Sequence, residues 1–414
     1  MLSSRKNSLT QFSLKLLLWL VPINCVIFEL YLLFGGIFKY ATYIISPIII
    51  FILLIKIFSS IKSINSNSYL LIVCFFITAY CVYFQFFMFG GTINNFVLWN
   101  IYGFATWLFP AFILYSRSSK ELYAFIKVVK RISIFGLVVG IVFLCMQYFT
   151  PISIRRFSSA MLFGSCLLLI IFVVYGLRSK RNLIILGVII FFLLAFSSNK
   201  REDLLFALIM FSGLLIFTHR KHKKWKVFLY VFSALVLFFV VLQPEDVIEF
   251  SERILPQKIK INDKSISELL FEDSRGTLPL DFYEDIKSDL LTGRGLVGMY
   301  ATPTFSPYYD QNFGGRDIIE IGYLQIILKG GVLLLITYLI IIIKAVSYGL
   351  WRTKNTLTKI FAFAIIVHML VMFWARVPAA DPYFMLLWLL AGFCLSKSIR
   401  NLTNDQIKTA LKHV

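Results

Sequence analysis

The fold of this chain is decided by one long polar stretch, residues 243–331, which contains 272-EDSRGTLPLDFYEDIKSDLLTGRGLVGMY-300 and 315-GRDIIEIGYLQIILKGG-331. Outside this stretch the chain is strongly apolar. Hydrophobic residues make up 59% of the 414 positions, and the mean hydropathy is +0.82. Soluble domains contain about 45–50% apolar residues. The sequence therefore predicts a membrane protein that holds the polar stretch at one face of the bilayer.

Apolar runs of about 20 residues, the length that crosses a bilayer, recur along the chain. They predict an all-α, polytopic membrane protein with about twelve transmembrane helices. The runs lie at 14–34, 38–58, 69–89, 95–115, 132–150, 159–177, 182–198, 203–218, 226–242, 317–346, 358–375 and 382–396. We therefore divide the chain into nine helices within residues 1–242, a large loop at 243–316, and three helices with a tail at 317–414. Because 317–346 exceeds one crossing, its first part, 317–329, is expected to form a helical extension at the outer surface.

The loops between these runs set the predicted orientation. Most of the 41 lysines and arginines fall in the N-terminal segment and in the loops that share its side. Cytoplasmic loops are rich in these residues, so we expect both termini in the cytoplasm and the long loop outside it. This distribution explains the net charge of +20 without a nucleic-acid partner. The first run lacks a small-residue cleavage pattern and is expected to be a helix rather than a signal peptide.

Neither a metal nor a cofactor is expected from the pattern of ligand-forming residues. All six cysteines lie inside apolar runs, and the four histidines are too scattered to form a ligand set. Gly293-Arg294-Gly295 forms a glycine-rich turn. This turn follows an amphipathic segment rather than a strand, so a dinucleotide site is not predicted. The loops on the cytoplasmic side are too short to fold into a nucleotide-binding domain.

The long loop has the apolar spacing of surface helices. Leu278, Phe282 and Ile286 recur every four residues, and Leu290 continues the series, with acidic residues between them. This spacing places the apolar side chains on one helical face. A second short helix with an apolar face is expected at 265–271. Both suit helices that lie on the bilayer surface or cover a central cavity.

Positive charge is disfavoured on the outer face, so the arginines and lysines predicted there require an explanation. The candidates for substrate binding are Arg155, Arg156, Lys200, Arg201, Arg275, Arg294, Arg316 and Arg376. Arginine binds a phosphate or diphosphate through two parallel hydrogen bonds, which suits a lipid-linked diphosphate in the outer leaflet. The alternative is that these residues anchor helix ends at headgroups or pair with acidic residues of the loop.

Two acidic residues at the end of the polar stretch are candidates for a catalytic general base. Asp317 and Glu320 are three positions apart, which places them on one face if a helix begins there. A sugar hydroxyl that attacks an anomeric carbon needs such a base within hydrogen-bonding distance. The alternative is that the two acids only start the helix, where its dipole favours negative charge.

Polar residues inside the apolar runs also gather towards the outer face. The predicted orientation places five of them in the outer halves of their helices: Glu29, Gln85, Asn100, Gln147 and His368. Intramembrane ionisable groups usually face a cavity, so this placement predicts a water-accessible cavity that opens to the outside. A lone histidine in a helix is interpreted as a packing residue rather than a catalytic one.

Several motifs and the overall plan resemble the bacterial O-antigen polymerase and O-antigen ligase superfamily. The motifs are Ser198-Asn199-Lys200-Arg201, Asp273-Ser274-Arg275 with Thr292-Gly293-Arg294-Gly295, and Glu320-Ile321-Gly322-Tyr323-Leu324 with Lys329-Gly330-Gly331. The plan is a set of about twelve helices with one large periplasmic loop late in the chain. The resemblance covers residues 198–345 in motif and the whole chain in predicted topology.

The resemblance implies a multi-pass protein of the bacterial inner membrane that transfers glycans at the periplasmic face without a metal or cofactor. Polymerases of this kind join oligosaccharide repeat units carried on undecaprenyl diphosphate, whereas ligases transfer finished polymer to lipid A-core. By the motif match, Arg201, Arg275 and Arg294 would hold the diphosphate or the glycan. Glu320 or Asp317 would lie near the acceptor. The implied partners are membrane lipid, a chain-length regulator and a flippase.

The sequence around Arg316 favours one member of this superfamily over the other. Ligases are expected to carry a catalytic histidine just before the span that follows the long loop. This chain has Arg316-Asp317-Ile318-Ile319-Glu320 there, and residues 243–316 contain no histidine. We therefore expect a polymerase, with O-antigen as its product and capsule or another exopolysaccharide left open. The alternatives are the ligase and a flippase or transporter for the same lipid-linked sugars, although no internal repeat typical of transporters is visible.

Overall fold

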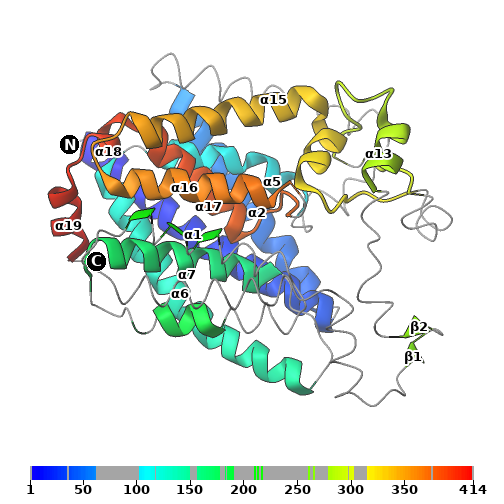
Figure 1. Cartoon of the computed structure of the whole chain (residues 1–414), viewed down its shortest axis with the longest axis horizontal. Helices are drawn as coiled ribbons and strands as arrows, with labels where there is room; N and C mark the ends of the chain where they lie inside the picture. Colours follow the sequence, from blue (N-terminus) through cyan, green and yellow to red (C-terminus); the bar gives the residue numbers. More distant parts are fainter. Residues whose placement is uncertain are drawn as a thin grey trace.

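The structure is a computed structural model, and the part of the chain that it describes is mostly helical (Figure 1). The described residues are 2–34, 37–61, 102–116, 118–149, 156–177, 182, 184–190, 209–210, 212–213, 216–217, 260–261, 264–265, 278–296, 298–302, 315–373 and 376–412. The predicted runs at 69–89 and 226–242 lie outside these residues. The helical class is therefore confirmed for most of the described chain, while the count of twelve spans stays a prediction.

Three helices among the described residues carry a stretch that is long and apolar enough to cross a membrane. They are α1 (Leu2–Phe34), α2 (Ile37–Ile61) and α15 (Gly322–Trp351), with the apolar stretches at Thr10–Tyr31, Tyr40–Ser60 and Gly322–Trp351. Each stretch overlaps a predicted run, with ends that differ by two to five residues, and α1 packs against α2. These helices fit a membrane protein.

Shorter apolar helices pack with the long ones. They are α5 (Phe104–Leu108) with the 3-10 helix η1 (Phe109–Tyr115), α7 (Arg156–Val174), α16 (Thr356–Val371) and α17 (Pro382–Leu395). α17 lies among η1, α7, α15 and α16, and residues 382–394 are all buried. A helix that is apolar on every face is suited to such a position, because other helices surround it.

The helix α6 (Ser119–Phe149) begins well before the predicted run at 132–150. The sequence predicts a basic loop there, but the backbone is already helical. Ser118 and Glu121 explain the early start: the Ser118 amide donates to Glu121 Oε2 at 2.8 Å, and the Glu121 amide donates to Ser118 Oγ at 3.4 Å. This reciprocal pair is a capping box, and Leu122 directly after it is fully buried.

Several loops that are predicted to be cytoplasmic meet at one end of the bundle, at the left of Figure 1. This end carries α18 (Lys397–Arg400) and α19 (Asn404–Lys412). Tyr175, which follows α7, donates its hydroxyl proton to Asn404 Oδ1 at 3.1 Å. Asn355, which caps α16, donates to the carbonyl oxygen of Ile399 at 2.9 Å. These contacts join the end of the predicted run at 159–177 to two predicted cytoplasmic segments that are far apart in the sequence.

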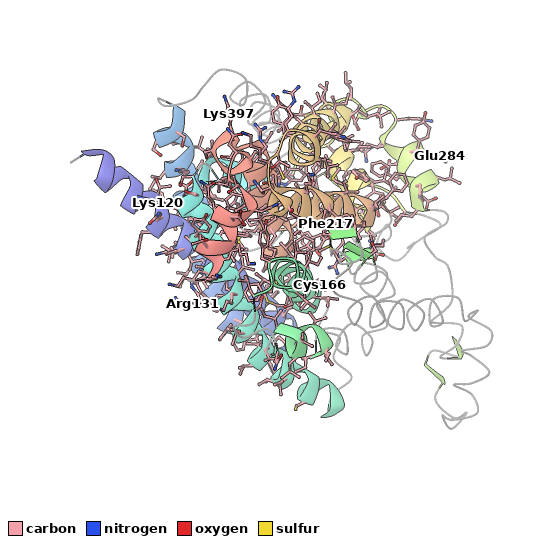
Figure 2. All side chains as sticks on the ribbon, turned by 60° about the vertical axis from the view of Figure 1, so that its left-hand side comes forward. Lys120, Arg131, Cys166, Phe217, Glu284 and Lys397 are labelled. Carbon is pink, nitrogen blue, oxygen red and sulfur yellow. The ribbon has the colours of Figure 1, made fainter. Side chains whose placement is uncertain are left out.

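The helix α13 (Leu278–Ile286) and the start of α15 lie at the opposite end of the molecule, at the right of Figure 1. In Figure 2, Lys397 and Glu284 are likewise far apart. Loops on opposite membrane faces must lie at opposite ends of the helices, so this separation agrees with the predicted topology. The assignment of one end to the cytoplasm stays a prediction from charge.

A small antiparallel hairpin departs from the all-α prediction. The strands β1 (Lys260–Ile261) and β2 (Lys264–Ser265) pair with Lys260 opposite Ser265 and Ile261 opposite Lys264. The helix predicted at 265–271 is therefore wrong at its first residue, and the rest of that segment lies outside the described residues.

Candidate functional site

The described part of the polar stretch packs onto the first half of α15. We call residues 278–296, 298–302 and 315–331 the outer unit. Its core consists of six buried residues: Leu278, Phe282, Ile286, Tyr300, Ile319 and Leu328. The rings of Phe282 and Tyr300 pack edge to face with 5.6 Å between their centroids. The three core residues from α13 are those that the amphipathic spacing placed on one face, so that prediction is confirmed.

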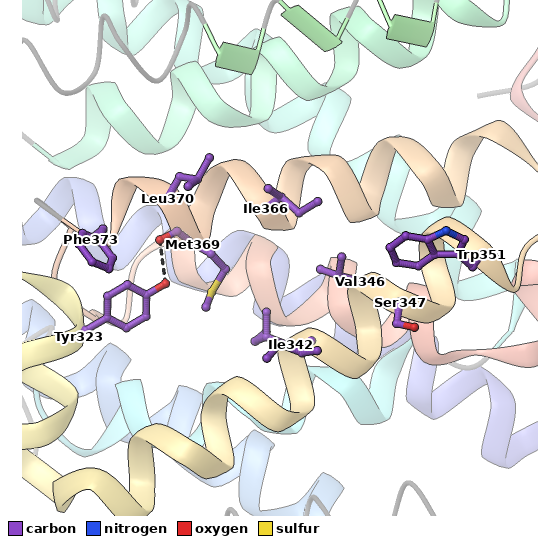
Figure 3. A pocket seen from close by; sticks show the side chains of 10 residues that line it. Tyr323, Ile342, Val346, Ser347, Trp351, Ile366, Met369, Leu370 and Phe373 are labelled. Carbon is purple, nitrogen blue, oxygen red and sulfur yellow. Dashed lines mark hydrogen bonds between the residues drawn. The ribbon is translucent and has the colours of Figure 1, made fainter.

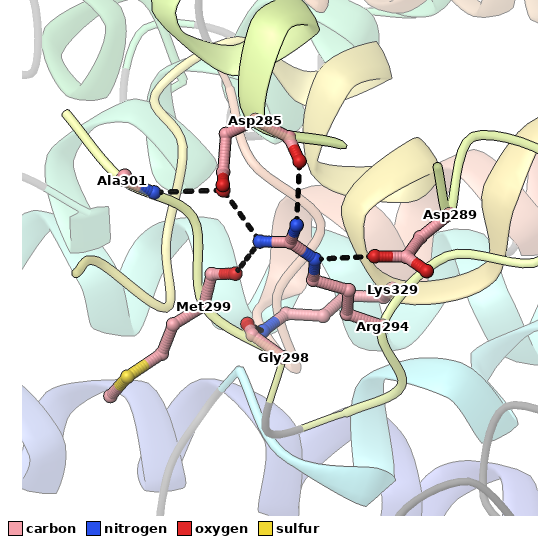
Figure 4. A network of polar contacts seen from close by, with 7 residues as sticks. All are labelled: Asp285, Asp289, Arg294, Gly298, Met299, Ala301 and Lys329. Carbon is pink, nitrogen blue, oxygen red and sulfur yellow. Dashed lines mark hydrogen bonds and ion pairs between the residues drawn. The ribbon is translucent and has the colours of Figure 1, made fainter. Parts of the chain in front are cut away.

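Arg294 is the centre of a polar network that closes the outer unit (Figure 4). Its Nε donates to Asp289 Oδ2 at 2.9 Å, and its Nη1 donates to Asp285 Oδ2 and to the Met299 carbonyl oxygen. Its Nη2 donates to the carbonyl oxygen of Asp285 at 2.6 Å. Asp285 Oδ2 also accepts the Ala301 amide at 2.9 Å. Because a guanidinium has about five N–H donors, most of them are engaged inside the outer unit.

The surroundings of Arg294 stabilise the charged form of its guanidinium. Burial opposes the charged form, but hydrogen bonds to Asp285 and Asp289 outweigh it and raise the pKa of the guanidinium above its ordinary value. An arginine that already pairs with two carboxylates has little capacity left for a diphosphate. These contacts favour the alternative raised by the sequence, pairing with acidic residues of the loop. The role of Arg294 in substrate binding stays a prediction.

Replacing Arg294 by alanine is expected to destabilise the outer unit by about 2 kcal/mol, because Asp285 and Asp289 lose a shared partner that is partly screened by solvent. The measurement is thermal unfolding of the purified protein in detergent, together with tryptic cleavage at the exposed Lys287. Arg294→Lys keeps the charge but cannot reach all four acceptors, so an intermediate loss is expected. Unchanged unfolding and cleavage with lost activity would instead support a direct role of Arg294 at the substrate.

The helix α15 is interrupted at Gly331, where φ is 67° and ψ is −173°. The loop after α13 fills the interruption: the Val332 amide donates to the Leu290 carbonyl at 2.9 Å, and the Arg294 amide donates to the Leu328 carbonyl at 2.7 Å. These bonds satisfy backbone groups that lose their partners at the break. The sequence predicts that the long run divides near this position, and the structure confirms a division there.

Lys329 is buried beside the break and is 1% exposed. Its Nζ donates to the carbonyl oxygen of Gly298 at 2.9 Å, as Figure 4 shows. Asp317 lies close enough to interact with it electrostatically. A buried ammonium group is costly unless it is paired and hydrogen-bonded. Lys329 therefore ties the first half of α15 to the loop and places a positive charge beside one of the two predicted acids.

Asp317 and Glu320 lie before α15 rather than in its first turns. The prediction that they share a helix face is wrong, because the helix begins at Gly322 after an extended residue. The side chain of Gln325 holds this segment in place, through hydrogen bonds that are not those of a helix. Its Oε1 accepts the Ile319 amide at 2.8 Å, and its Nε2 donates to the Asp317 carbonyl at 3.3 Å. Sequence reasoning missed Gln325, whose only signal was a polar residue on the buried face of an apolar run.

Arg316 and Glu320 lie side by side at the edge of the outer unit. Arg316 Nη2 is 3.8 Å from Glu320 Oε1, and their side chains are 17% and 39% exposed. The backbone of Arg316 pairs with that of Tyr300 through two hydrogen bonds of 2.9 Å, which fixes the position of the segment. A carboxylate and a guanidinium are thus held together where solvent reaches both.

Arg376, between α16 and α17, lies close to the start of α15. Its φ of 65° is rare for a residue other than glycine, and its guanidinium carbon is 5.3 Å from the ring centroid of Tyr383. A Cβ atom at Gly322 would lie 2.3 Å from the Arg376 carbonyl oxygen, and the Gly322 amide donates to the Met372 carbonyl at 3.1 Å. The fold therefore brings the Arg376 segment next to Glu320, two residues before Gly322.

Other residues named from the sequence are not placed. Arg155, Lys200, Arg201, Arg275, Gln85 and Asn100 lie outside the described residues, as do the side chains of Arg156 and Gln147. Arg156 begins α7, whose other end reaches Tyr175 near α19. The backbone of Arg156 therefore belongs to the end of the bundle that carries the outer unit.

His368 lies inside an aromatic cluster rather than beside a cavity. It is fully buried, and its ring stacks on Tyr383 with 3.9 Å between centroids. Phe163 and Phe384 pack edge-on against it, and neither ring nitrogen has a hydrogen-bond partner among the described residues. Glu29 is also buried, at 3% exposed. The packing interpretation of His368 is confirmed, but its predicted place at an outward-facing cavity is wrong.

Comparison with known proteins adds no assignment to this geometry. No family model, curated protein or solved structure matches the chain.

Proposed function

We propose that this chain is a surface-polysaccharide polymerase of the bacterial inner membrane, with about twelve transmembrane helices and O-antigen as its product. It joins oligosaccharide repeat units carried on undecaprenyl diphosphate, at the periplasmic face. The observation that carries the proposal is that Arg316 and Glu320 directly precede α15 and that the Arg376 segment contacts Gly322, at the end of α15 that lies opposite α18 and α19 (Figure 1). A base beside cations on the outer side suits transfer from a lipid-linked diphosphate.

In the proposed reaction, the Glu320 carboxylate accepts the proton of the acceptor hydroxyl. The hydroxyl oxygen then attacks the anomeric carbon of the donor glycan. One glycosidic bond forms while the bond between that carbon and the diphosphate oxygen breaks, and undecaprenyl diphosphate leaves with the bonding electrons. The proton on Glu320 passes to solvent. Asp317, beside Lys329, is the second candidate for this base.

Arginine side chains stabilise the charge that develops on the departing diphosphate. Arg316 is held next to Glu320, and Arg376 lies over Tyr383 in a strained backbone conformation. Backbone strain of this kind is concentrated at functional sites, because the surrounding structure must maintain it. Lys200, Arg201 and Arg275 are proposed to complete the anion site from the undescribed part of the chain.

The polymerase is favoured over the ligase and over a transporter. Residues 243–316 contain no histidine, and the segment before α15 presents Arg316 and Glu320 where a ligase is expected to have one. A transporter typically binds its substrate near the membrane midplane between repeated units. The candidate residues that the structure describes lie at one end of the helices, which supports an enzyme acting on one face.

Deleting the gene for this chain is expected to remove the polymer ladder of the surface polysaccharide and to leave single repeat units on lipid A-core. The reason is that a polymerase is needed only after the first unit has been made and exported. The measurement is gel electrophoresis of surface lipopolysaccharide, with the wild-type gene restored as the control. Loss of every repeat unit would identify a ligase or flippase instead, and an unchanged ladder would contradict the proposal.

A further inference from the structure

Three cationic side chains surround one tyrosine ring at the end of α15 that lies opposite the outer unit. Lys344 Nζ is 5.9 Å from the ring centroid of Tyr348, and the guanidinium carbons of Arg352 and Arg400 are each 4.8 Å from it. Lys344 and Arg352 stand one helical turn before and after Tyr348, while Arg400 comes from α18. We call these four residues the Tyr348 cluster.

The Tyr348 cluster has an excess of positive charge. Within the described part of the chain, none of its three cations forms an ion pair with a carboxylate. Arg400 is only 9% exposed, and its Nε is buried without a hydrogen-bond partner there, although its Nη1 donates to the Arg352 carbonyl at 2.8 Å. The negative end of α15 supplies about half a unit charge, which offsets little of the repulsion among three cations. The arrangement is suited to an anion.

An apolar groove runs between α15 and α16 (Figure 3). Its lining includes Ser347 and Trp351, which directly precede Tyr348 and Arg352 in the chain. Its volume is about 390 Å³, and Val346, Ser347 and Trp351 form its wall near Tyr348, with Ile366 across from them. Trp351 is 75% exposed, as is typical of aromatic residues at the membrane–water boundary. The stretch of α15 that lines this half, residues 342–351, is about 14 Å long, roughly half of the hydrocarbon core. That is the depth of one lipid leaflet.

We propose that the Tyr348 cluster and the adjoining half of the groove bind one anionic phospholipid of the cytoplasmic leaflet. The lipid phosphate lies at the three cations, and one acyl chain lies between α15 and α16. A second copy of this chain is a poorer occupant, because it would bring another basic end against the cluster. The inference does not depend on the proposed glycosyl transfer, only on the predicted orientation of this end.

The test uses the full-length protein purified in neutral detergent, with phosphatidylglycerol as the probe and native mass spectrometry as the measurement. The double variant Lys344→Gln/Arg352→Gln is expected to bind phosphatidylglycerol roughly 30-fold more weakly. The reason is that each cation near a lipid surface strengthens binding by roughly 5-fold. The matched control is Lys397→Gln/Lys408→Gln, which removes two exposed lysines at the same end. Its binding of phosphatidylglycerol is expected to weaken far less. Arg352→Lys keeps the charge and is expected to retain binding.

Two further probes distinguish the sources of the phosphate. Phosphatidylcholine is expected to bind weakly, and glycerol 3-phosphate, which has no acyl chain, is expected not to protect the protein against thermal unfolding. Ile366→Trp fills the groove without changing the charge and is expected to weaken phosphatidylglycerol binding. The proposal is overturned if phosphatidylcholine binds as tightly as phosphatidylglycerol, or if Lys397→Gln/Lys408→Gln weakens phosphatidylglycerol binding as much as Lys344→Gln/Arg352→Gln does. It is also overturned if glycerol 3-phosphate protects against thermal unfolding as well as the lipid does.

Discussion

Replacing Glu320 by glutamine is expected to reduce polymer extension by about 10²–10⁴-fold, the usual contribution of a general base. The amide keeps the shape of the side chain but cannot accept the proton of the acceptor hydroxyl. Glu320 is 39% exposed beside Arg316, so the change should not disturb the core of the outer unit. The measurement is the length distribution of surface polysaccharide in a deletion strain that expresses the variant at the wild-type level.

The matched control for this prediction is Glu284→Gln, which removes an exposed carboxylate from α13 in the same outer unit. It is expected to leave the ladder unchanged. Asp317→Asn tests the second candidate, and a strong loss there with a normal ladder from Glu320→Gln would move the role of base to Asp317. Wild-type ladders from both variants would contradict the proposed reaction.

Replacing Gly331 by alanine is expected to destabilise the protein by about 4 kcal/mol, through backbone strain and the loss of loop hydrogen bonds. The φ of 67° and ψ of −173° belong to a region that is essentially restricted to glycine. A Cβ atom there would also lie 2.1 Å from the Leu291 carbonyl oxygen, so the loop would have to move away from α15. The measurement is the free energy of unfolding in detergent, followed by tryptophan fluorescence.

Gly176→Ala provides the control, because Gly176 also has a positive φ, 66°, but a Cβ atom there would meet nothing within 4 Å. It is expected to cost only about 1 kcal/mol of strain. The difference between the two variants then measures the contact between the loop and the interrupted helix. Equal losses from both would show that this contact contributes no stability.

Local sequence patterns were sufficient to predict the elements whose structure depends on residues close together in the chain. The spacing of Leu278, Phe282 and Ile286 predicted both the helix α13 and its buried face, because helical geometry repeats over a few residues. The length of the run at 317–346 predicted its division after residue 329, because one bilayer crossing needs only about 20 residues. The early start of α6 was missed, although the capping pair Ser118 and Glu121 was a readable local signal.

The candidate site was only partly predictable, because its contacts join distant segments. The sequence indicated that Arg294 is a positive charge on the outer face. Its partners, Asp285 and Asp289, could not be told from the other acidic residues of the loop, because the pairing depends on how the loop folds back. Asp317 and Glu320 were expected in a helix, since the apolar run appears continuous from there. The structure instead holds them with Gln325, a residue whose partners no local pattern reveals.

By itself, the sequence determined that the described chain is mostly apolar helix and that the polar stretch contains the helix α13, because these follow from composition and local periodicity. Only the tertiary structure decided where α15 begins and breaks, which residues pair with Arg294, and that the Arg376 segment lies beside Glu320. The physical reason is packing: Gly322 and Gly331 lack the Cβ atoms that would keep these segments apart. The polar stretch is thereby held against the end of the bundle.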